Sequence, residues 1–180
     1  MANWYSDRIG TDGSADSTIG SPFPTSPAGR ADGRLRVSHS SITVTDTAAS
    51  DVLWMARFKS SDRILAVYYN TDGGFNASNS AELGFYTGNS TYDGDVLDID
   101  IFGDSIDLTS AVDVLTDAFS LLAAVGGEDR MKTIWELLTL GAQSYTVDPN
   151  ILVDLCWTLN ADDDATSSTL TTTVLYTSVG

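Results

Sequence analysis

One cysteine and one histidine are the residues of this sequence with the widest chemical use. Cys156 stands in the β-like run Val153–Trp157, where a small buried thiol is expected rather than a reactive one. A lone cysteine also excludes an intrachain disulfide and a cysteine-based zinc cluster. His39 has no neighbouring cysteine and no second histidine to share a metal ion. We therefore expect a solvated or turn-packed histidine and no metal site on it.

Ser105 lies in a Gly-Asp-Ser-Ile run, residues 103–106, that is similar to the nucleophile block of the Gly-Asp-Ser-Leu hydrolases. A serine nucleophile needs a base to remove its proton. In that family the base is a histidine in an Asp-x-x-His block near the C-terminus, and residues 162–180 contain no histidine. The run therefore predicts a turn in which the serine or the aspartate bonds to the backbone.

Two acidic clusters supply carboxylates of the kind that calcium requires. Asp93, Asp95, Asp98 and Asp100 form one cluster, and residues 162–164 form the other. Neither follows the Asp-x-Asn/Asp-x-Asn/Asp-Gly spacing of a calcium loop. Alternation in residues 98–101 places both aspartates on one strand face and both isoleucines on the other. A solvated acidic face is expected, and calcium binding is the alternative left open.

The charge balance narrows the classes of partner. The chain has 180 residues, with 9 Lys and Arg against 25 Asp and Glu, and a formal net charge of −16. Nucleic-acid affinity comes largely from Lys and Arg, so no nucleic acid is expected as a partner. Apolar runs such as Leu121–Val125 are far short of the roughly 20 residues that span a membrane. The first residues lack the pattern of a secretory signal, which predicts synthesis in the cytoplasm and no membrane partner.

Residues 1–33 differ from the rest and predict an extended N-terminal arm. They hold three of the four prolines and show no apolar periodicity. The charges of residues 1–36 cancel, so the whole −16 lies on residues 37–180. Aromatic rings on a segment that cannot bury them often anchor to a partner, because they give a large contact area at low entropic cost. The candidate binding residues are Trp4, Tyr5, Arg8, Phe23, Arg30 and Arg34. The alternative is that the rings fold back on their own domain.

Residues 34–180 predict one domain built of strands. β-Branched and aromatic residues dominate its apolar runs, and such residues suit a pleated, half-buried surface. The strands are expected at residues 35–44, 52–58, 63–70, 81–86, 98–101, 131–140, 151–159 and 168–178. The polar residues near position 40 predict a bulge or turn in the first strand. The short polar link Lys59–Asp62 predicts a hairpin between the second and the third.

One segment has the spacing of a helix instead. Its apolar residues recur at intervals of 3, 4 and 3 positions: Val112, Leu115, Phe119 and Leu122. We expect a helix of about four turns between Thr109 and Val125, started by Thr109 or Ser110 and ended by Gly126-Gly127. Many short strands and one short helix predict an all-β fold, a jelly-roll-like β-sandwich with an N-terminal arm, rather than a parallel α/β fold.

The order of these segments resembles small structural proteins encoded near the capsid genes of tailed bacteriophages. The similar runs are Val52–Asn70, Glu82–Tyr86, Ile101–Ala111, Trp135–Leu138 with Asp148-Pro149, and the Thr-rich last strand. They resemble head decoration, or cement, proteins, which are often jelly rolls and bind the outside of the capsid shell. The resemblance covers residues 34–180 and carries no catalytic or metal signature.

This resemblance implies a non-enzymatic virion protein on the outer capsid surface, made in the host cytoplasm and without a cofactor. Its expected partner is the major capsid protein, with a second copy of the chain on the lattice as a further partner left open. The arm residues named above are then the expected capsid contacts.

A different class of function stays open from the sequence, a carbohydrate-binding β-sandwich of a tail or spike. Sugar binding uses aromatic platforms and sometimes calcium. The aromatic residues that suggest it are Trp54, Tyr68, Tyr69, Tyr92 and Trp135. A glycosidase or esterase is not expected, because among 25 acidic residues some pair is always close and no base or nucleophile pattern stands out.

Overall fold

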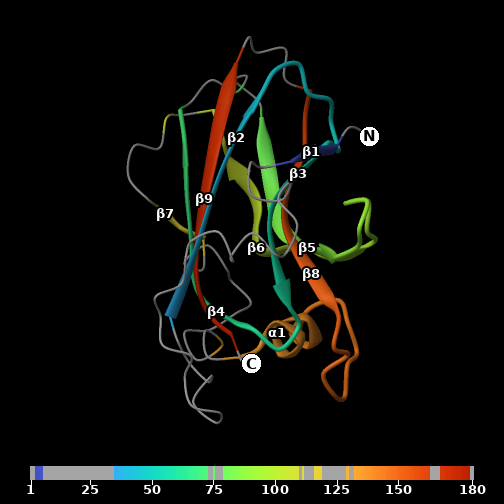
Figure 1. Cartoon of the computed structure of the whole chain (residues 1–180). Coiled ribbons are helices and arrows are strands. Elements are labelled where there is room, and N and C mark those ends of the chain that lie inside the picture. Colours follow the sequence, from blue (N-terminus) through green and yellow to red (C-terminus); the bar gives the residue numbers. More distant parts are fainter. Residues whose placement is uncertain are drawn as a thin grey trace.

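Two β-sheets packed face to face make up the body of the protein in the computed structural model (Figure 1). The structure describes residues 3–5, 35–72, 75, 79–109, 111, 116–118, 129, 132–162 and 167–178. The five-stranded sheet runs, in order, β1 (Asn3–Tyr5), β3 (Val52–Lys59), β8 (Leu152–Leu159), β5 (Ser80–Thr87) and β6 (Val96–Asp107). The four-stranded sheet runs β2 (Leu35–Val44), β9 (Ser168–Thr177), β4 (Arg63–Thr71) and β7 (Thr116–Asp117).

The path of the chain between the sheets is that of a jelly roll. Every connection from β2 to β5 crosses from one sheet to the other, β5 and β6 pair as neighbours, and every later connection from β6 to β9 crosses again. Apart from the parallel pair β1–β3, all pairs are antiparallel. The strand orders β2-β9-β4-β7 and β3-β8-β5-β6 are those of an eight-stranded jelly roll. The expected all-β, jelly-roll-like sandwich is confirmed.

The predicted hairpin over residues 59–62 is wrong. The strands on either side of it, β3 and β4, belong to different sheets. The link is a tight turn, in which the Asp62 carboxylate accepts a hydrogen bond from the Lys59 N–H at 2.9 Å. Alternation along a strand reports which face is buried but not which strand lies beside it. Two adjacent runs therefore look alike whether they pair or face each other across the core.

The bulge expected near residue 40 is absent, because β2 pairs with β9 through consecutive residues from Leu35 to Val44. Ser40 points into the sandwich and is buried. Its hydroxyl donates to the Met55 carbonyl at 2.7 Å, which satisfies the buried polar group. A small hydroxyl side chain can thus occupy a core position without breaking the strand.

The helix lies elsewhere than predicted. Residues 116–117 form strand β7 inside the segment 109–125 that was expected to be helical, and residues 112–115 and 119–125 lie outside the described residues. The described helix is α1 (Ile134–Leu140), within a run expected to be a strand. Its signal is a Thr-x-x-Glu start, in which the Glu136 carboxylate accepts from the Thr133 N–H at 2.7 Å.

Helix α1 closes one end of the sandwich (Figure 1). Its buried residues, Ile134, Leu137 and Leu138, follow the i, i+3, i+4 spacing of a helical face. The N–H groups of Ile134 and Trp135 donate to the carbonyls of Asp62 and Ser60 at 2.8 and 3.0 Å. The turn between β3 and β4 therefore satisfies donors that the start of a helix leaves free. No helix in the described part of the chain is long and apolar enough to cross a membrane.

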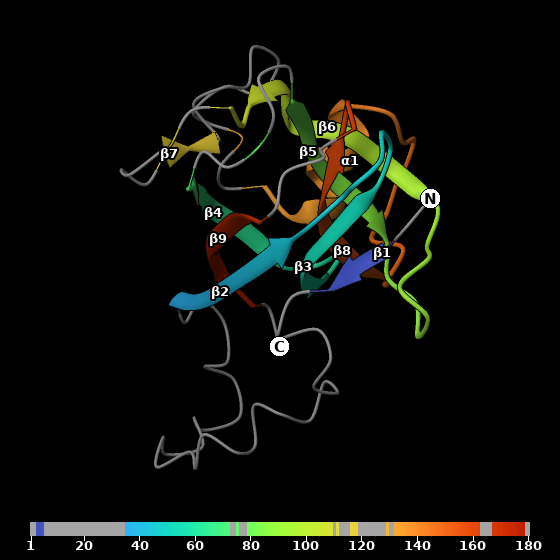
Figure 2. The same ribbon diagram turned by 90° about the horizontal axis from the view of Figure 1, so that it is seen from above.

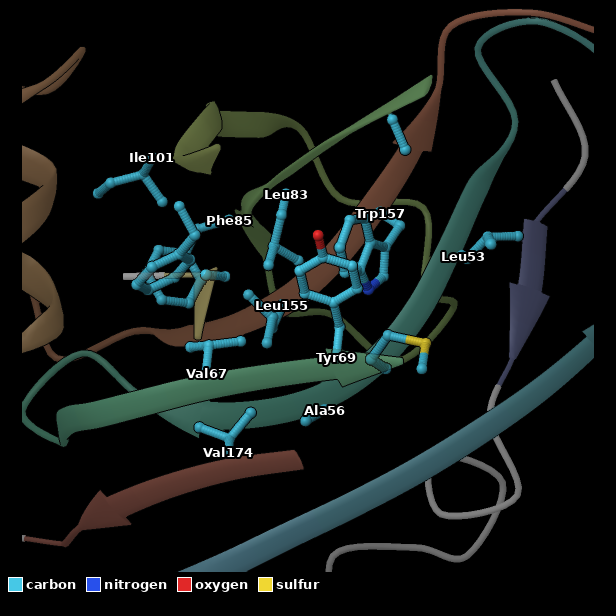
Figure 3. Packing of buried hydrophobic residues seen from close by; sticks show 14 of the residues in the cluster. Leu53, Ala56, Val67, Tyr69, Leu83, Phe85, Ile101, Leu155, Trp157 and Val174 are labelled. Atoms are coloured by element: carbon cyan, nitrogen blue, oxygen red, sulfur yellow. The ribbon is translucent and has the colours of Figure 1, made fainter. Parts of the chain in front are cut away.

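The core lies between the two sheets (Figure 3). Tyr69 of β4 and Trp157 of β8 meet edge to face with ring centroids 5.2 Å apart, which joins the sheets by an aromatic contact. The Trp157 indole N–H donates to the Thr172 hydroxyl of β9 at 2.9 Å, and both side chains are buried. Thr172 is thus a polar residue that the core requires.

Replacing Thr172 by valine tests this buried hydrogen bond. Thr172→Val keeps the shape of the side chain but leaves the Trp157 N–H unsatisfied, which should lower the free energy of unfolding by about 1–3 kcal/mol. Thr171→Val is the matched control, because Thr171 faces outward beside Ser41 and water can replace its hydrogen bond. Its effect should stay within about 0.5 kcal/mol. Urea unfolding followed by tryptophan fluorescence measures both, and equal effects would contradict this role of Thr172.

Candidate functional site

A β-bulge in β3 brings a charged residue out of the core. The pairing of β3 with β8 shifts between Trp54 and Ala56. Leu53, Met55 and Ala56 all pack in the core between the sheets. Strict alternation would have turned the side chain of residue 57 inward as well. The extra residue of the bulge reverses the direction of the side chains that follow it. Arg57 consequently lies on the outer face of the five-stranded sheet.

Arg57 forms a two-pronged ion pair with Asp154 of β8, the residue directly opposite it. Its Nε and Nη2 atoms donate to the two carboxylate oxygens at 2.6 and 2.7 Å. The Asp154 side chain is fully buried, whereas 25% of the Arg57 side chain is exposed. Burial raises the pKa of Asp154 and the guanidinium opposes that rise, while the hydrogen bond to Asp154 raises the pKa of Arg57.

The same guanidinium contacts the loop between β5 and β6, residues 88–95. Its Nη2 atom also donates to the Asn89 carbonyl at 2.6 Å, and its carbon lies 4.3 Å from the centre of the Tyr92 ring. The Tyr92 ring in turn meets Trp54 at 6.2 Å, and Trp54 meets Tyr86 at 5.3 Å. These rings belong to a second, smaller apolar region beside the main core, which we call the outer-face cluster. It consists of Val52, Trp54, Tyr86 and Cys156, with Tyr92 packed against them.

Cys156 belongs to the outer-face cluster and is fully buried there. Burial raises the pKa of its thiol well above the ordinary value, which opposes formation of a thiolate. The expectation of a buried thiol is confirmed.

The first acidic cluster serves the local structure of this loop and of β6. The Asp93 carboxylate accepts from the Asn89 amide at 2.7 Å and from the Thr91 hydroxyl at 2.5 Å, and these bonds lower the pKa of Asp93. Asp98 is buried and accepts from the Ala142 N–H at 3.3 Å, and its burial raises its pKa. The solvated face predicted for Asp98 and Asp100 is therefore wrong at Asp98, because the segment after α1 covers it.

No group of three His, Cys, Asp or Glu in the described ranges is arranged to hold a metal ion. In the second acidic cluster, the Asp162 carboxylate accepts from the Ala49 N–H at 2.7 Å. Asp163 and Asp164 lie outside the described residues.

The serine and the histidine considered for catalysis lie on different sheets. Ser105 is in β6 at a shift of the β5–β6 register, with a left-handed backbone (φ 54°) and its hydroxyl donating to Asp104 at 2.8 Å. The predicted turn is thus an irregularity within a strand. His39 is on β2, with Nδ1 2.9 Å from the Thr173 hydroxyl. β2 lies on the side of the sandwich away from β6 (Figure 2).

The outer face of the four-stranded sheet has a different character. We call it the threonine face and define it by the outward residues of β2, β9 and β4: Leu35, Val37, His39, Ser41, Thr43, Thr169, Thr171, Thr173, Leu175, Tyr68 and Asn70. Side-chain hydroxyls link its strands, with Ser41–Thr171 and Thr43–Thr169 each at 3.1 Å. No residue of these three strands is acidic.

Two of the six predicted arm contacts fall in described structure. Trp4 and Tyr5 are in β1, where the backbone of Asn3–Tyr5 pairs in parallel with Val52–Trp54 at the edge of β3. The other four, Arg8, Phe23, Arg30 and Arg34, lie outside the described residues. Their contact with a partner stays a prediction, as does the division of the chain at residue 33.

The five aromatic residues of the carbohydrate hypothesis do not share one surface. Trp54 and Tyr69 are buried, the first under the outer-face cluster and the second in the core between the sheets. Tyr68 lies on the threonine face and Trp135 on α1. The sequence shows the residue types of a sugar platform, but the fold separates them.

Comparison with known proteins gives a likeness in fold. No known family and no curated protein matches the sequence. A chain in a solved structure titled "Capsid of Ralstonia phage GP4" superimposes with a TM-score of 0.59 and 10% identity, over 99% of this chain and 99% of that one. A chain of "Cyanophage Pam1 capsid asymmetric unit" aligns with a TM-score of 0.46 and 13% identity, over 88% of this chain and 94% of that one. The first likeness shows a shared fold.

Removing the arginine tests the ion pair of the outer-face cluster. Arg57→Ala leaves the buried Asp154 carboxyl without its counter-charge, which should lower the free energy of unfolding by about 3–5 kcal/mol at neutral pH. The pKa of Asp154 in the folded variant should then rise further above its unfolded value. A carboxyl whose pKa is raised in the folded state destabilises the fold at pH values above that raised pKa. It no longer does so below its pKa in the unfolded chain, which is near 3.9. The loss of unfolding free energy in Arg57→Ala relative to wild type, which we call the deficit, should therefore shrink as the pH falls.

Urea unfolding of wild type and variant between neutral pH and about pH 4 measures this dependence. The matched control is Arg57→Ala combined with Asp154→Asn, which has no titrating carboxyl and should show a deficit that changes little with pH. A deficit of Arg57→Ala that stays constant across this range would contradict the role assigned to Asp154.

Proposed function

We propose that this chain is a non-enzymatic structural protein of a tailed bacteriophage that binds the outer surface of the mature capsid lattice and stabilises the shell. The observation that carries the proposal is the agreement in fold, over nearly the whole of both chains, with a chain of the Ralstonia phage GP4 capsid. The segment pattern of residues 34–180 resembles head decoration proteins independently of that agreement. The partner is the major capsid protein.

The described chemistry supports a structural role. His39 bonds to a threonine on an exposed strand face, and Cys156 is buried. Ser105 bonds to its neighbour Asp104 and lies on the other sheet from His39. The described residues thus hold these groups apart instead of assembling a nucleophile with a base.

A rigid body with an arm suits attachment to a lattice. The two sheets share a continuous core, and Arg57 fastens the loop after β5, so the body presents a fixed shape. The arm, residues 1–33, contacts a capsid subunit through Trp4, Tyr5, Arg8, Phe23 and Arg30, with Arg34 at its junction. Trp4 and Tyr5 make this contact from β1, beside β3 of their own body. Its three prolines lower the entropy that is lost on docking. Many copies that bind only the mature shell stabilise it by mass action.

Co-sedimentation with capsids tests the proposal. The purified protein should pellet with undecorated, expanded capsids of its phage in a saturable way, at a stoichiometry that matches a lattice site. Saturated capsids should then survive heating longer than bare ones, because binding favours the intact shell. Unexpanded shells are the control and should bind little. Pelleting no greater than background on expanded capsids would refute the proposal.

Truncation tests the arm separately. A variant that lacks residues 1–33 should lose capsid binding and still unfold cooperatively, because the described core residues lie in the body. Trp4→Ala with Tyr5→Ala should weaken binding at least tenfold, since buried aromatic anchors are typical hot spots. Val147→Ala, at an exposed position of the body, should leave the affinity unchanged. If the truncated protein binds capsids as tightly as the full chain, the arm has no such role.

A further inference from the structure

The two sheets divide the charged residues of the strands unequally. Strands of the five-stranded sheet carry Glu82, Asp98, Asp100, Asp104, Asp107 and Asp154. In the four-stranded sheet, β2, β4 and β9 carry no acidic residue. The one acidic residue on the described strands of that sheet is Asp117, on the short strand β7. β2 and β4 instead bring Arg36 and Arg63. In a chain of net charge −16, the threonine face is thus a broad strand surface free of negative charge.

Among the described residues, the threonine face ends in a long edge strand, β2, with few of the usual protections. Natural proteins prevent edge strands from pairing with other chains by shortness, bulges, prolines or charged residues. Among the described edges, β7 has two residues and β1 three, and β6 has register shifts and four aspartates. β2 has ten residues in unbroken register with β9, no proline and no acidic residue, and Arg36 near its start is its one Lys or Arg. Leu35 and Val37 on it are 61% and 55% exposed.

We infer that the edge of β2 pairs with β2 of a second copy of this chain, in an antiparallel two-fold dimer that joins the two threonine faces into one continuous sheet. Antiparallel pairing of identical strands gives a closed, self-complementary contact, which stops at two copies. The inference goes beyond the proposed function and does not depend on capsid binding.

Charge decides which surface a second copy can occupy. Two chains of −16 repel each other wherever their acidic surfaces meet. Contact along β2 brings together two strands without acidic residues. β2 lies over the β1–β3 side of the other sheet, so β5 and β6, which carry most of the strand carboxylates, lie toward the opposite edge of each copy. The remaining repulsion acts over a distance and is screened by salt, since the Debye length is about 10 Å at 0.1 M.

Side-chain alternation limits the register of the pair. Residues opposite each other in adjacent strands must point to the same face. A two-fold axis that keeps the faces continuous therefore passes through a residue position, and the middle of β2 offers His39 or Ser40. In either register Val37 stands opposite an outward serine or threonine of the other copy, Ser41 or Thr43. A charge at position 37 is then placed within the contact.

The size of the contact predicts weak association in solution. The copies meet along the edge of one strand, and at about 3.4 Å per residue the ten residues of β2 give a contact about 34 Å long and one strand wide. A stable interface buries about 800 Å² on each partner. We therefore expect a dissociation constant between about 10 μM and 1 mM, which an ordered lattice would overcome through high local concentration.

Sedimentation velocity of the full chain over a range of concentrations tests the pairing. The wild type should form a reversible dimer that tightens several-fold as NaCl rises from about 0.02 M to about 0.5 M. Val37→Asp should weaken the dimer at least tenfold. Val147→Asp is the matched control, because Val147 is 71% exposed in a loop away from β2 and the substitution changes the net charge equally.

A cross-link makes the result independent of any effect of Val37→Asp on folding. Residues opposite each other in antiparallel strands have Cβ atoms about 4.5–5.5 Å apart, within reach of a disulfide after small adjustments. With the axis at His39, two copies of His39→Cys face each other and should give covalent dimers under mild oxidation. With the axis at Ser40, position 39 of one copy faces position 41 of the other, so an equal mixture of His39→Cys and Ser41→Cys proteins should cross-link while neither does alone. Val147→Cys should give few, and the native Cys156 is buried.

Three results would overturn the inference. The first is a wild type that stays monomeric to about 1 mM at high salt. The second is equal weakening by Val37→Asp and Val147→Asp. The third is a mixture of His39→Cys and Ser41→Cys proteins that cross-links no better than Val147→Cys. Capsid binding by a protein that fails these tests would leave the proposed function in place.

Discussion

The placement of negative charge is the constraint on which much of this structure depends. A jelly roll brings eight strands into two layers, and a chain with 25 Asp and Glu must do so without placing carboxylates against one another. The structure meets this demand by assigning its strand carboxylates almost wholly to one sheet. There they accept backbone N–H groups, as Asp98 does, or meet a cation, as Asp154 does. The other sheet is left with hydroxyls and apolar side chains on its outer face.

The Arg57–Asp154 pair shows how local backbone geometry decides where a charge lies. The bulge between Trp54 and Ala56 puts Met55 and Ala56 both in the core and so turns Arg57 to the outside. Without that extra residue the guanidinium would face Leu155 and Trp157 in the core, where an unpaired charge is far too costly. The same guanidinium then reaches Asn89 and Tyr92, so one bulge in β3 also fixes the loop after β5.

Strands could be read from the sequence wherever burial alternates on a regular backbone. β9 follows this rule, since Leu170, Thr172 and Val174 are buried and the residues between them are not. The rule fails where a second interaction overrides it. Helix α1 depends on a Thr133–Glu136 start, which is a polar capping pattern rather than an apolar one. Its three buried residues lie in a run whose apolar content predicts a strand. The burial of Asp98 depends on residues 141–143, far away in the sequence, so no local pattern could reveal it.

Weak contact between copies and firm contact with a shell are compatible demands on one molecule. A strong, open-ended contact between free copies would build filaments before any copy met a capsid, whereas a closed two-fold contact cannot grow. A net charge of −16 adds long-range repulsion that keeps free copies soluble. On a shell, the arm would fix each body in place and raise the local concentration of its neighbours, so that a contact too small to hold two free copies together can still link them. The acid-free edge of β2 is the part of the described body that meets both conditions, because it permits contact and contributes no repulsion of its own.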